Sequence, residues 1–250
     1  MAEPEDVLHH LATGLLGALG DEVLSVAVHG SWALGDFSAG HSDLDVLVVL
    51  ASDPTTATLA SLHEVHARLA QEFPEWGDGH VEVEYVSAEA IRAVVRGTDD
   101  AHPMISVGKG EPLHELTASR HSVLNWAAAL QADRAIAGAA PSTMLPAIDQ
   151  RLIDQVILDH VRAWPEWVEE MQHAGGQAYA VLTLCRAAEA LSTGRHVSKL
   201  AAAGAGKSRY PEWSALIDWA EQWWYHSGSD DDVGRFEDVR RCVVRSAGAW

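Results

Sequence analysis

The stretch Val28-His29-Gly30-Ser31, followed after eleven residues by Asp43-Leu44-Asp45, decides the predicted fold. The apolar run from Val23 to Val28 predicts one strand. The run from Asp43 to Leu50 predicts a second strand that is apolar at nearly every position and is therefore covered on both faces. Side chains two residues apart on a strand share a face. The two aspartates of the second strand are therefore expected to point the same way.

Two neighbouring carboxylates repel each other, and a divalent cation between them removes that repulsion. Asp43 and Asp45 therefore predict a Mg²⁺ site that also holds a triphosphate. Gly30 lets the backbone come close to a phosphate, and Ser31 offers a hydroxyl and a backbone N–H to the same oxygens. Gly30-Ser31 alone is compatible with an ordinary turn, and Asp43 with Asp45 alone is compatible with solvent-facing acids. The combination is far more specific, because two acids buried on an apolar strand without a cation would be costly.

A third carboxylate is expected on a neighbouring strand. The segment from Val81 to Val86 alternates apolar and acidic residues, which is strand periodicity. Glu82 and Glu84 are two apart and share a face. One of them can accept a proton from an acceptor hydroxyl or complete the metal shell, and the other can face a cationic acceptor. Geometry alone does not choose between the two.

The rest of the chain predicts two domains: an α/β domain over residues 1–108, with a small mixed sheet, and an α-helical bundle over 109–250. The segment from Gly97 to Pro112 is the expected linker because of its glycine and proline content.

His29 is open to two interpretations, a site residue or a strand end. Helical patterns are expected over 5–19, 55–72, 88–96, 116–131, 148–172, 179–192, 213–224 and 233–245, with Ser87 as a helix cap and residues 201–206 as a loop or a helix start.

The amino-acid composition limits the classes of partner that the protein is expected to bind. The net charge of −19 disfavours nucleic acid, whose binding depends on Lys and Arg, and favours a cationic small molecule. No apolar run is long enough for a membrane span, and the first residues are acidic, unlike a signal peptide. Two cysteines suit a reducing compartment. We therefore expect a cytoplasmic monomer that interacts with neither membranes nor nucleic acid.

The G-S-x11-D-x-D pattern with its glutamate-bearing strand resembles the DNA polymerase β-like nucleotidyltransferases. In the helical half, three features resemble the aminoglycoside (3'')(9) adenylyltransferases, which inactivate streptomycin and spectinomycin. These features are the run from Val181 to Arg186, Thr193-Gly194 with Ser198-Lys199 after it, and Tyr225. The resemblance implies ATP as co-substrate, magnesium as cofactor, and a helical domain that closes a cleft for ATP and the acceptor.

The resemblance also implies roles for individual residues. Asp43 and Asp45 would hold magnesium, and Glu82 would be the catalytic base at the same metal centre. From the helical half, Arg186 and Lys199 would contact the ATP phosphates. Two further residues follow by position: Tyr225 would lie near the nucleotide, and Trp167 would line the acceptor site, where the residue reasoning also places Glu84.

One departure leaves the acceptor open. The family's drug-binding segment carries acids where this chain has Gln172 and Gly176, so the guanidinium groups of streptomycin would lack partners there. The alternatives are another aminocyclitol, a different small molecule or a protein side chain. A non-catalytic nucleotide-binding module is a further alternative. This alternative is disfavoured because a site that no longer catalyses a reaction does not need the clustered carboxylates of Asp43, Asp45 and Glu82.

Overall fold

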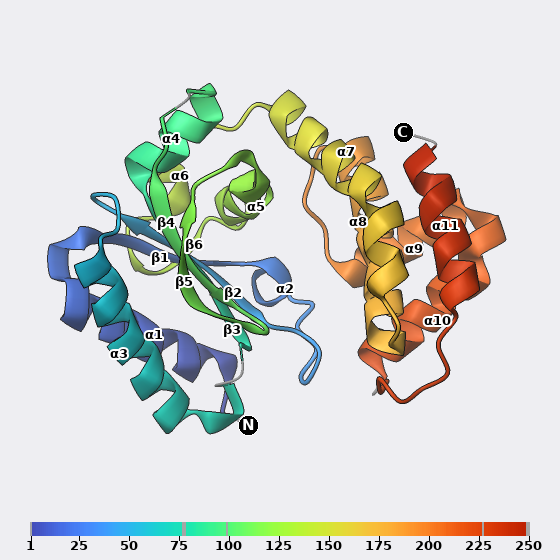
Figure 1. The fold of residues 1–250 in the computed structure, drawn as a ribbon, viewed down its shortest axis with the longest axis horizontal. Coiled ribbons are helices and arrows are strands. Elements are labelled where there is room, and N and C mark those ends of the chain that lie inside the picture. Colours follow the sequence, from blue (N-terminus) through green and yellow to red (C-terminus); the bar gives the residue numbers. More distant parts are fainter. Residues whose placement is uncertain (1, 77–78, 99, 227, 249–250) are drawn as a thin grey trace. The chain divides into compact units, whose positions relative to one another are not determined.

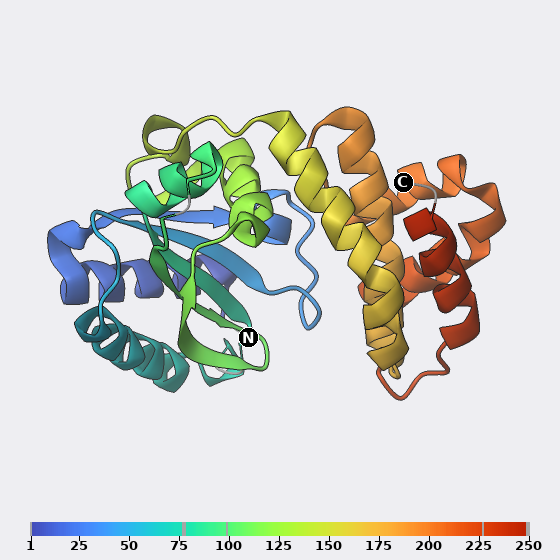
Figure 2. The same cartoon turned by 45° about the horizontal axis from the view of Figure 1, so that its top comes forward.

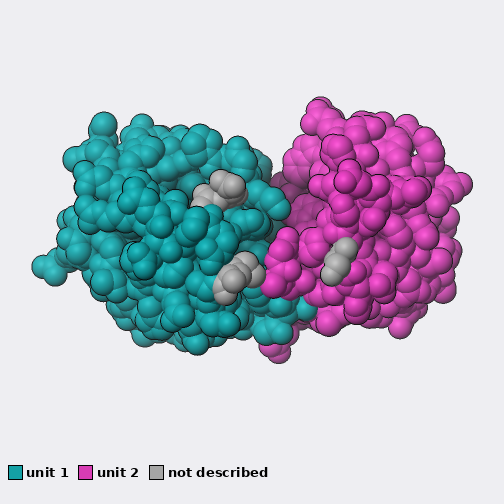
Figure 3. All heavy atoms as spheres, turned by 90° about the horizontal axis from the view of Figure 1, so that it is seen from below, with its two compact units in different colours: residues 1–37, 42–149 teal, residues 38–41, 150–250 magenta. Residues whose placement is uncertain are grey.

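The computed structural model describes residues 2–76, 79–98, 100–226 and 228–248. The chain divides into two compact units, which are coloured separately in Figure 3. Unit 1 comprises residues 1–37 and 42–149, and unit 2 comprises residues 38–41 and 150–250. The division thus falls at 149/150 and not at the predicted 108/109. The reason is that the segment before residue 149 still supplies strands to the sheet of unit 1.

Unit 1 is built on one six-stranded sheet with the order β5-β4-β3-β2-β1-β6 (Figure 1). β2 and β3 pair in parallel, whereas the other neighbouring strands pair antiparallel, so the predicted mixed sheet is confirmed. Because parallel strands need a crossover, the helix α3 (Thr56–Glu72) connects β2 to β3. The strands are β1 (Val23–His29), β2 (Leu44–Leu50), β3 (Val81–Ser87), β4 (Pro103–Gly108), β5 (Glu111–Thr117) and β6 (Arg134–Gly138).

The two faces of this sheet carry different side chains. α1 (Pro4–Leu19) and α3 (Thr56–Glu72) cover one face, and Val46 and Val48 of β2 belong to their apolar core. Side chains alternate along a strand, so Asp45 projects from the opposite face. α5 (Val123–Ala132) lies on that opposite face, and Figure 2 shows the same separation from a second direction. The fold therefore leaves the acids of β2 and β3 outside the main core.

The expected linker from Gly97 to Pro112 is wrong. It contains β4 and the first residues of β5, which form a hairpin joined by Lys109 and Gly110. A two-residue connection with glycine at the second position is a typical hairpin turn. The predicted helix over 116–131 also begins later than expected, because β5 extends to Thr117 and α5 begins only at Val123.

Unit 2 is helical, as predicted. α8 is its central helix and packs against the other four long helices. The stretch 201–206 lies inside α9, whose first turn is capped by the Ser198 hydroxyl as it accepts from the backbone N–H of Ala201. None of the described helices combines the length and apolar character that a membrane crossing requires. The helices are α7 (Gln150–Trp167), α8 (Ala174–Thr193), α9 (Lys199–Arg209), α10 (Ser214–Tyr225) and α11 (Phe236–Gly248).

Candidate active site

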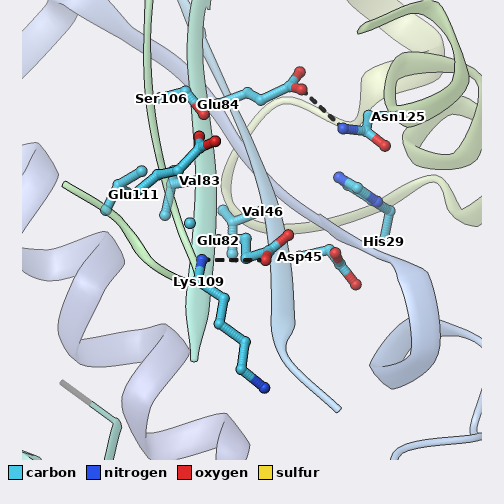
Figure 4. Close-up of a pocket in the computed structure, with 12 residues that line it drawn as sticks. His29, Asp45, Val46, Glu82, Val83, Glu84, Ser106, Lys109, Glu111 and Asn125 are labelled. Atoms are coloured by element: carbon cyan, nitrogen blue, oxygen red, sulfur yellow. Dashed lines mark hydrogen bonds between the residues drawn. The ribbon is translucent and has the colours of Figure 1, made fainter. Parts of the chain in front are cut away.

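A polar cavity of about 300 Å³ opens on the face of the sheet that carries Asp45 (Figure 4). β1, β2 and β3 form its base, the β4–β5 hairpin supplies Lys109, and α5 supplies Asn125. Carboxylates dominate the lining, so the cavity suits cations and cation-bound phosphates. Its polar lining consists of His29, Asp45, Glu82, Glu84, Ser106, Lys109, Glu111 and Asn125.

Three of these side chains form one row across adjacent strands. His29 of β1 is the antiparallel partner of Asp45 in β2, and Asp45 is the parallel partner of Glu82 in β3. Direct partners on neighbouring strands have side chains about 5 Å apart on the same face. The predicted meeting of an aspartate with a glutamate from the neighbouring strand therefore has a structural basis. His29, which the sequence left open, is 5 % exposed and lines the cavity.

Gly30 holds the backbone directly against Asp45. Its φ is +63°, and a Cβ atom at this position would lie 1.8 Å from Oδ2 of Asp45. No other residue fits here without moving the carboxylate. Ser31 follows in the short helix α2 (Gly30–Ala33) and is half-buried. The glycine that was predicted to approach a phosphate thus also keeps space for an acid.

The carboxyl group of Glu82 is strongly perturbed by its surroundings in the cavity. Burial is the main cause, and the charges of Asp45 and Asp43 add to it; together they raise the pKa of the Glu82 carboxyl to about 7. The backbone N–H of Lys109 donates to Oε1 at 3.4 Å, which acts in the opposite direction. A carboxyl with a pKa near neutrality is well suited to take up a proton during a reaction.

Asp43 lies just before β2, one residue short of the strand that was predicted to include it. Its Oδ1 is 3.0 Å from Nδ1 of His80. Within the described ranges, no three His, Cys, Asp or Glu side chains already form a group that could hold a metal ion. Mg²⁺ does not require such a cage, because it binds through one or two carboxylates, waters and substrate phosphates. The oxygen donors of Asp43, Asp45 and Glu82 fit this ion.

Glu84 has the same strand face as Glu82 but different partners. Its Oε1 accepts from Nδ2 of Asn125 at 2.8 Å, and its Oε2 accepts from Nε1 of Trp126 at 3.1 Å. Burial raises the pKa of the Glu84 carboxyl to about 6, although these hydrogen bonds oppose the rise. Glu84 thus joins β3 to α5 and also lines the cavity. The sequence could not indicate Asn125, because only the fold brings it to β3.

The remaining predicted residues lie in unit 2. Nζ of Lys199 is 4.0 Å from the ring centroid of Trp224 and 5.4 Å from that of Tyr179. Nη2 of Arg186 is 3.2 Å from Nε2 of His196. Tyr225 is the last residue of α10. Lys199 therefore lies on an aromatic surface of unit 2 that the sequence did not reveal.

Trp167 ends α7 and is 40 % exposed. Its ring contacts Trp164 edge-on at a centroid distance of 5.7 Å, and Trp164 contacts Tyr179 at 6.0 Å. The aromatic contacts are therefore continuous from Trp167 to the rings beside Lys199. Trp167 is therefore partly packed against aromatic rings of unit 2 and partly exposed.

The two positions at which the resemblance implies acids, Gln172 and Gly176, lie in close local contact with their neighbours. The Gln172 side chain donates from Nε2 to the backbone oxygen of Glu169 at 2.8 Å. At Gly176, a Cβ atom would lie 2.9 Å from Sδ of Met171. A side chain at position 176 would therefore require the methionine to move.

Comparisons with known proteins agree with this architecture. A family model described as a nucleotidyltransferase domain matches residues 14–93, and one described as the C-terminal domain of aminoglycoside adenylyltransferase matches residues 143–248. A search of curated proteins finds no match. Among solved structures, the spectinomycin adenyltransferase AAD(9) from Enterococcus faecialis, crystallised with ATP and spectinomycin, is similar. Its TM-score is 0.78 at 16 % identity, over 98 % of this chain and 100 % of that one.

Proposed function

Because the chain belongs to the aminoglycoside adenylyltransferase-like nucleotidyltransferases, we propose that it transfers AMP from ATP to a hydroxyl group of an aminoglycoside or aminocyclitol antibiotic. The observation that carries the proposal is the row of Asp45 and Glu82 on two parallel strands, held beside Gly30 at the base of a polar cavity. In this proposal the protein acts as a cytoplasmic monomer.

Glu82 is the proposed base. The acceptor oxygen attacks the α-phosphorus of ATP, a new P–O bond forms, and the bond to the bridging oxygen breaks as pyrophosphate leaves. The hydroxyl proton passes to the carboxylate of Glu82, whose pKa is raised by burial and by the charges of Asp45 and Asp43, so that it accepts a proton more readily than a free carboxylate does. Asp45 stays in place because Gly30 leaves room for it.

Asp43, Asp45 and Glu82 would hold Mg²⁺. When bound, this ion offsets the charge of the triphosphate and of the carboxylates beside it. Gly30 and Ser31 would contact the phosphates from α2. Arg186 and Lys199 of unit 2 would supply the cationic groups for the phosphates, with Tyr225 near the nucleotide. A set of fixed charges of this kind stabilises the charge that develops during phosphoryl transfer.

A cationic acceptor fits the charge of the cavity. Beyond Asp45 and Glu82, its lining contains the carboxylates of Glu84 and Glu111. The whole chain carries a net charge of −19, which attracts a cation from a distance. Trp167 would add an aromatic surface from unit 2. The acids absent at Gln172 and Gly176 favour an acceptor other than streptomycin.

Mass spectrometry tests the proposal. The protein is incubated with ATP, Mg²⁺ and a panel of aminoglycosides and aminocyclitols, and the antibiotics are then analysed. We expect at least one antibiotic to gain the mass of one AMP, and the Asp45→Asn variant to produce no such adduct. AMP on a protein side chain or on a different metabolite would show the same chemistry with another acceptor. Binding of ATP without turnover of any acceptor would instead indicate a nucleotide-binding module.

A further inference from the structure

A histidine outside the predicted site is paired with one of its carboxylates. Nδ1 of His80 lies 3.0 Å from Oδ1 of Asp43, and the two side chains are 29 % and 21 % exposed. An ionised carboxylate only accepts hydrogen bonds, so the proton of this bond is on Nδ1. The pair is therefore directional, with His80 as the donor.

The strand register holds this pair in place. In the parallel pairing of β2 with β3, Leu44 is the partner of Val81 and Asp45 is the partner of Glu82. The ladder continues one step further back, because the N–H of Leu44 donates to the backbone oxygen of His80 at 2.9 Å. The position of His80 beside Asp43 is thus set by main-chain hydrogen bonds and not by two mobile surface side chains.

The same register creates two successive rows on one face. In the row that faces the cavity, Asp45 lies beside the carboxylate of Glu82. In the row before it, Asp43 lies beside a hydrogen-bond donor, His80. Asp45 and Asp43 both act on the Glu82 carboxyl, which shows that three negative groups gather here. A donor on one of them limits their freedom to turn away from one another.

We propose that His80 is a positioning residue for the metal site: its Nδ1–H holds Oδ1 of Asp43, so that Oδ2 is presented to the divalent cation. Hydrogen bonds of this kind orient metal-binding carboxylates, and their loss typically weakens metal binding by about 10–100-fold. An exposed pair without this role would contribute little to stability and nothing to metal affinity. The inference rests on the proposed function, because it requires that Asp43 binds the cation.

The test measures metal binding without turnover. Mn²⁺ replaces Mg²⁺, a non-hydrolysable ATP analogue with a methylene group between the α- and β-phosphorus replaces ATP, and free Mn²⁺ is followed by electron paramagnetic resonance. We expect His80→Ala to weaken Mn²⁺ binding about 10–100-fold. His80→Asn should restore most of the affinity, because the asparagine amide can occupy the place of Nδ1. His80→Gln is the matched control, since its amide reaches the place of Nε2 instead and should not restore it.

The outcomes separate the inference from the proposed function. Equal Mn²⁺ affinity in wild-type protein and His80→Ala overturns the inference, and so does tighter binding by the variant, which would mean that His80 competes with the metal. Weak binding by all three His80 variants alike also overturns it, because the effect would not follow the donor position. A different failure concerns the function: if wild-type protein and Asp45→Asn bind Mn²⁺ equally, the metal site itself is misplaced. Melting temperatures of all variants confirm that the fold is intact.

Discussion

The cavity of unit 1 is lined by carboxylates, whereas the aromatic surface of unit 2 holds a lysine. The two regions therefore differ in the sign of their charge and in the groups that surround it. In unit 1, Asp45 and Glu82 are adjacent because two strands pair in register. In unit 2, Lys199 at the start of α9 lies over the ring of Trp224, which α10 brings to it. The difference teaches that acids gathered on a sheet need a cation from outside, whereas a lysine over aromatic rings is held by the protein itself.

The largest expected effect comes from unit 1. Asp45→Asn should abolish AMP transfer, because the change is nearly isosteric but removes a charge that the metal needs. Asp43→Asn should do the same. Without metal, both variants should melt at the wild-type temperature or slightly above it, since one like-charge repulsion disappears. Transfer assays with Mg²⁺ and thermal melts in a chelator measure both effects. Near wild-type activity of either variant would refute the metal assignment.

Next in size is Glu82→Gln, which separates the base from the nucleotide site. Turnover should fall about 10²–10⁴-fold, as expected for a lost general base. Binding of ATP with Mg²⁺ should weaken far less, because two aspartates remain. The surface variant Glu64→Gln, from a pair with Arg68, serves as the control and should leave kcat unchanged. Wild-type turnover by Glu82→Gln would show that another group is the general base.

The raised pKa of Glu82 also predicts a pH-dependent stability. Below the usual pKa of about 4.5, the carboxyl is protonated in both folded and unfolded chains. Between about 4.5 and 7, the unfolded chain loses the proton first, so the fold loses stability as pH rises. The loss amounts to up to about 3 kcal/mol at 1.36 kcal/mol per unit.

Urea unfolding in a chelator, at several pH values between 4.5 and 7.5, measures this slope. Glu82→Gln should remove the part of the pH dependence that comes from Glu82. The pKa of Glu84, raised to about 6, and the pKa of His66, lowered by burial to about 4, add contributions of opposite sign that stay in both proteins. If the unfolding free energies of the variant and of wild-type protein depend on pH in the same way, the pKa of Glu82 is not raised in the folded protein.

For unit 2, the corresponding change is Lys199→Ala. Loss of one charge-assisted hydrogen bond, about 1.5–3 kcal/mol, should raise KM for ATP about 10–100-fold. Lys207→Ala is a matched control on the same helix, since Lys207 is paired with Asp218 and Glu221. If both variants keep the wild-type KM, the aromatic surface does not hold a nucleotide-binding lysine.

The smallest effect should come from Glu84→Gln. The sequence interpretation expects a rise in KM for the acceptor, as lost uniform binding would cause. The hydrogen bonds from Asn125 and Trp126 already occupy both carboxylate oxygens, so we expect this rise to stay below about tenfold. Kinetics with one verified acceptor measure it. A loss of kcat as large as that of Glu82→Gln would show that Glu84 acts in the chemical step and not only in acceptor binding.

Sequence reasoning placed β1, β2 and β3 within one residue of their ends, because each is an apolar or alternating run with clear boundaries. It missed β4, β5 and β6. These strands are more exposed than β1, β2 and β3, and β4 begins with a proline. Such segments become strands because a neighbour satisfies their backbone groups, and local propensity does not encode that neighbour.

What the sequence determined by itself is the chemistry of single elements: two aspartates two residues apart, two glutamates two residues apart, and a glycine before the first pair. The period of a strand is local, so these placements follow without knowledge of the fold. Only the tertiary structure decided which elements meet: His29 with Asp45, His80 with Asp43, Asn125 with Glu84. Those contacts depend on strand register and helix packing between distant segments, where many pairings are compatible with one local pattern.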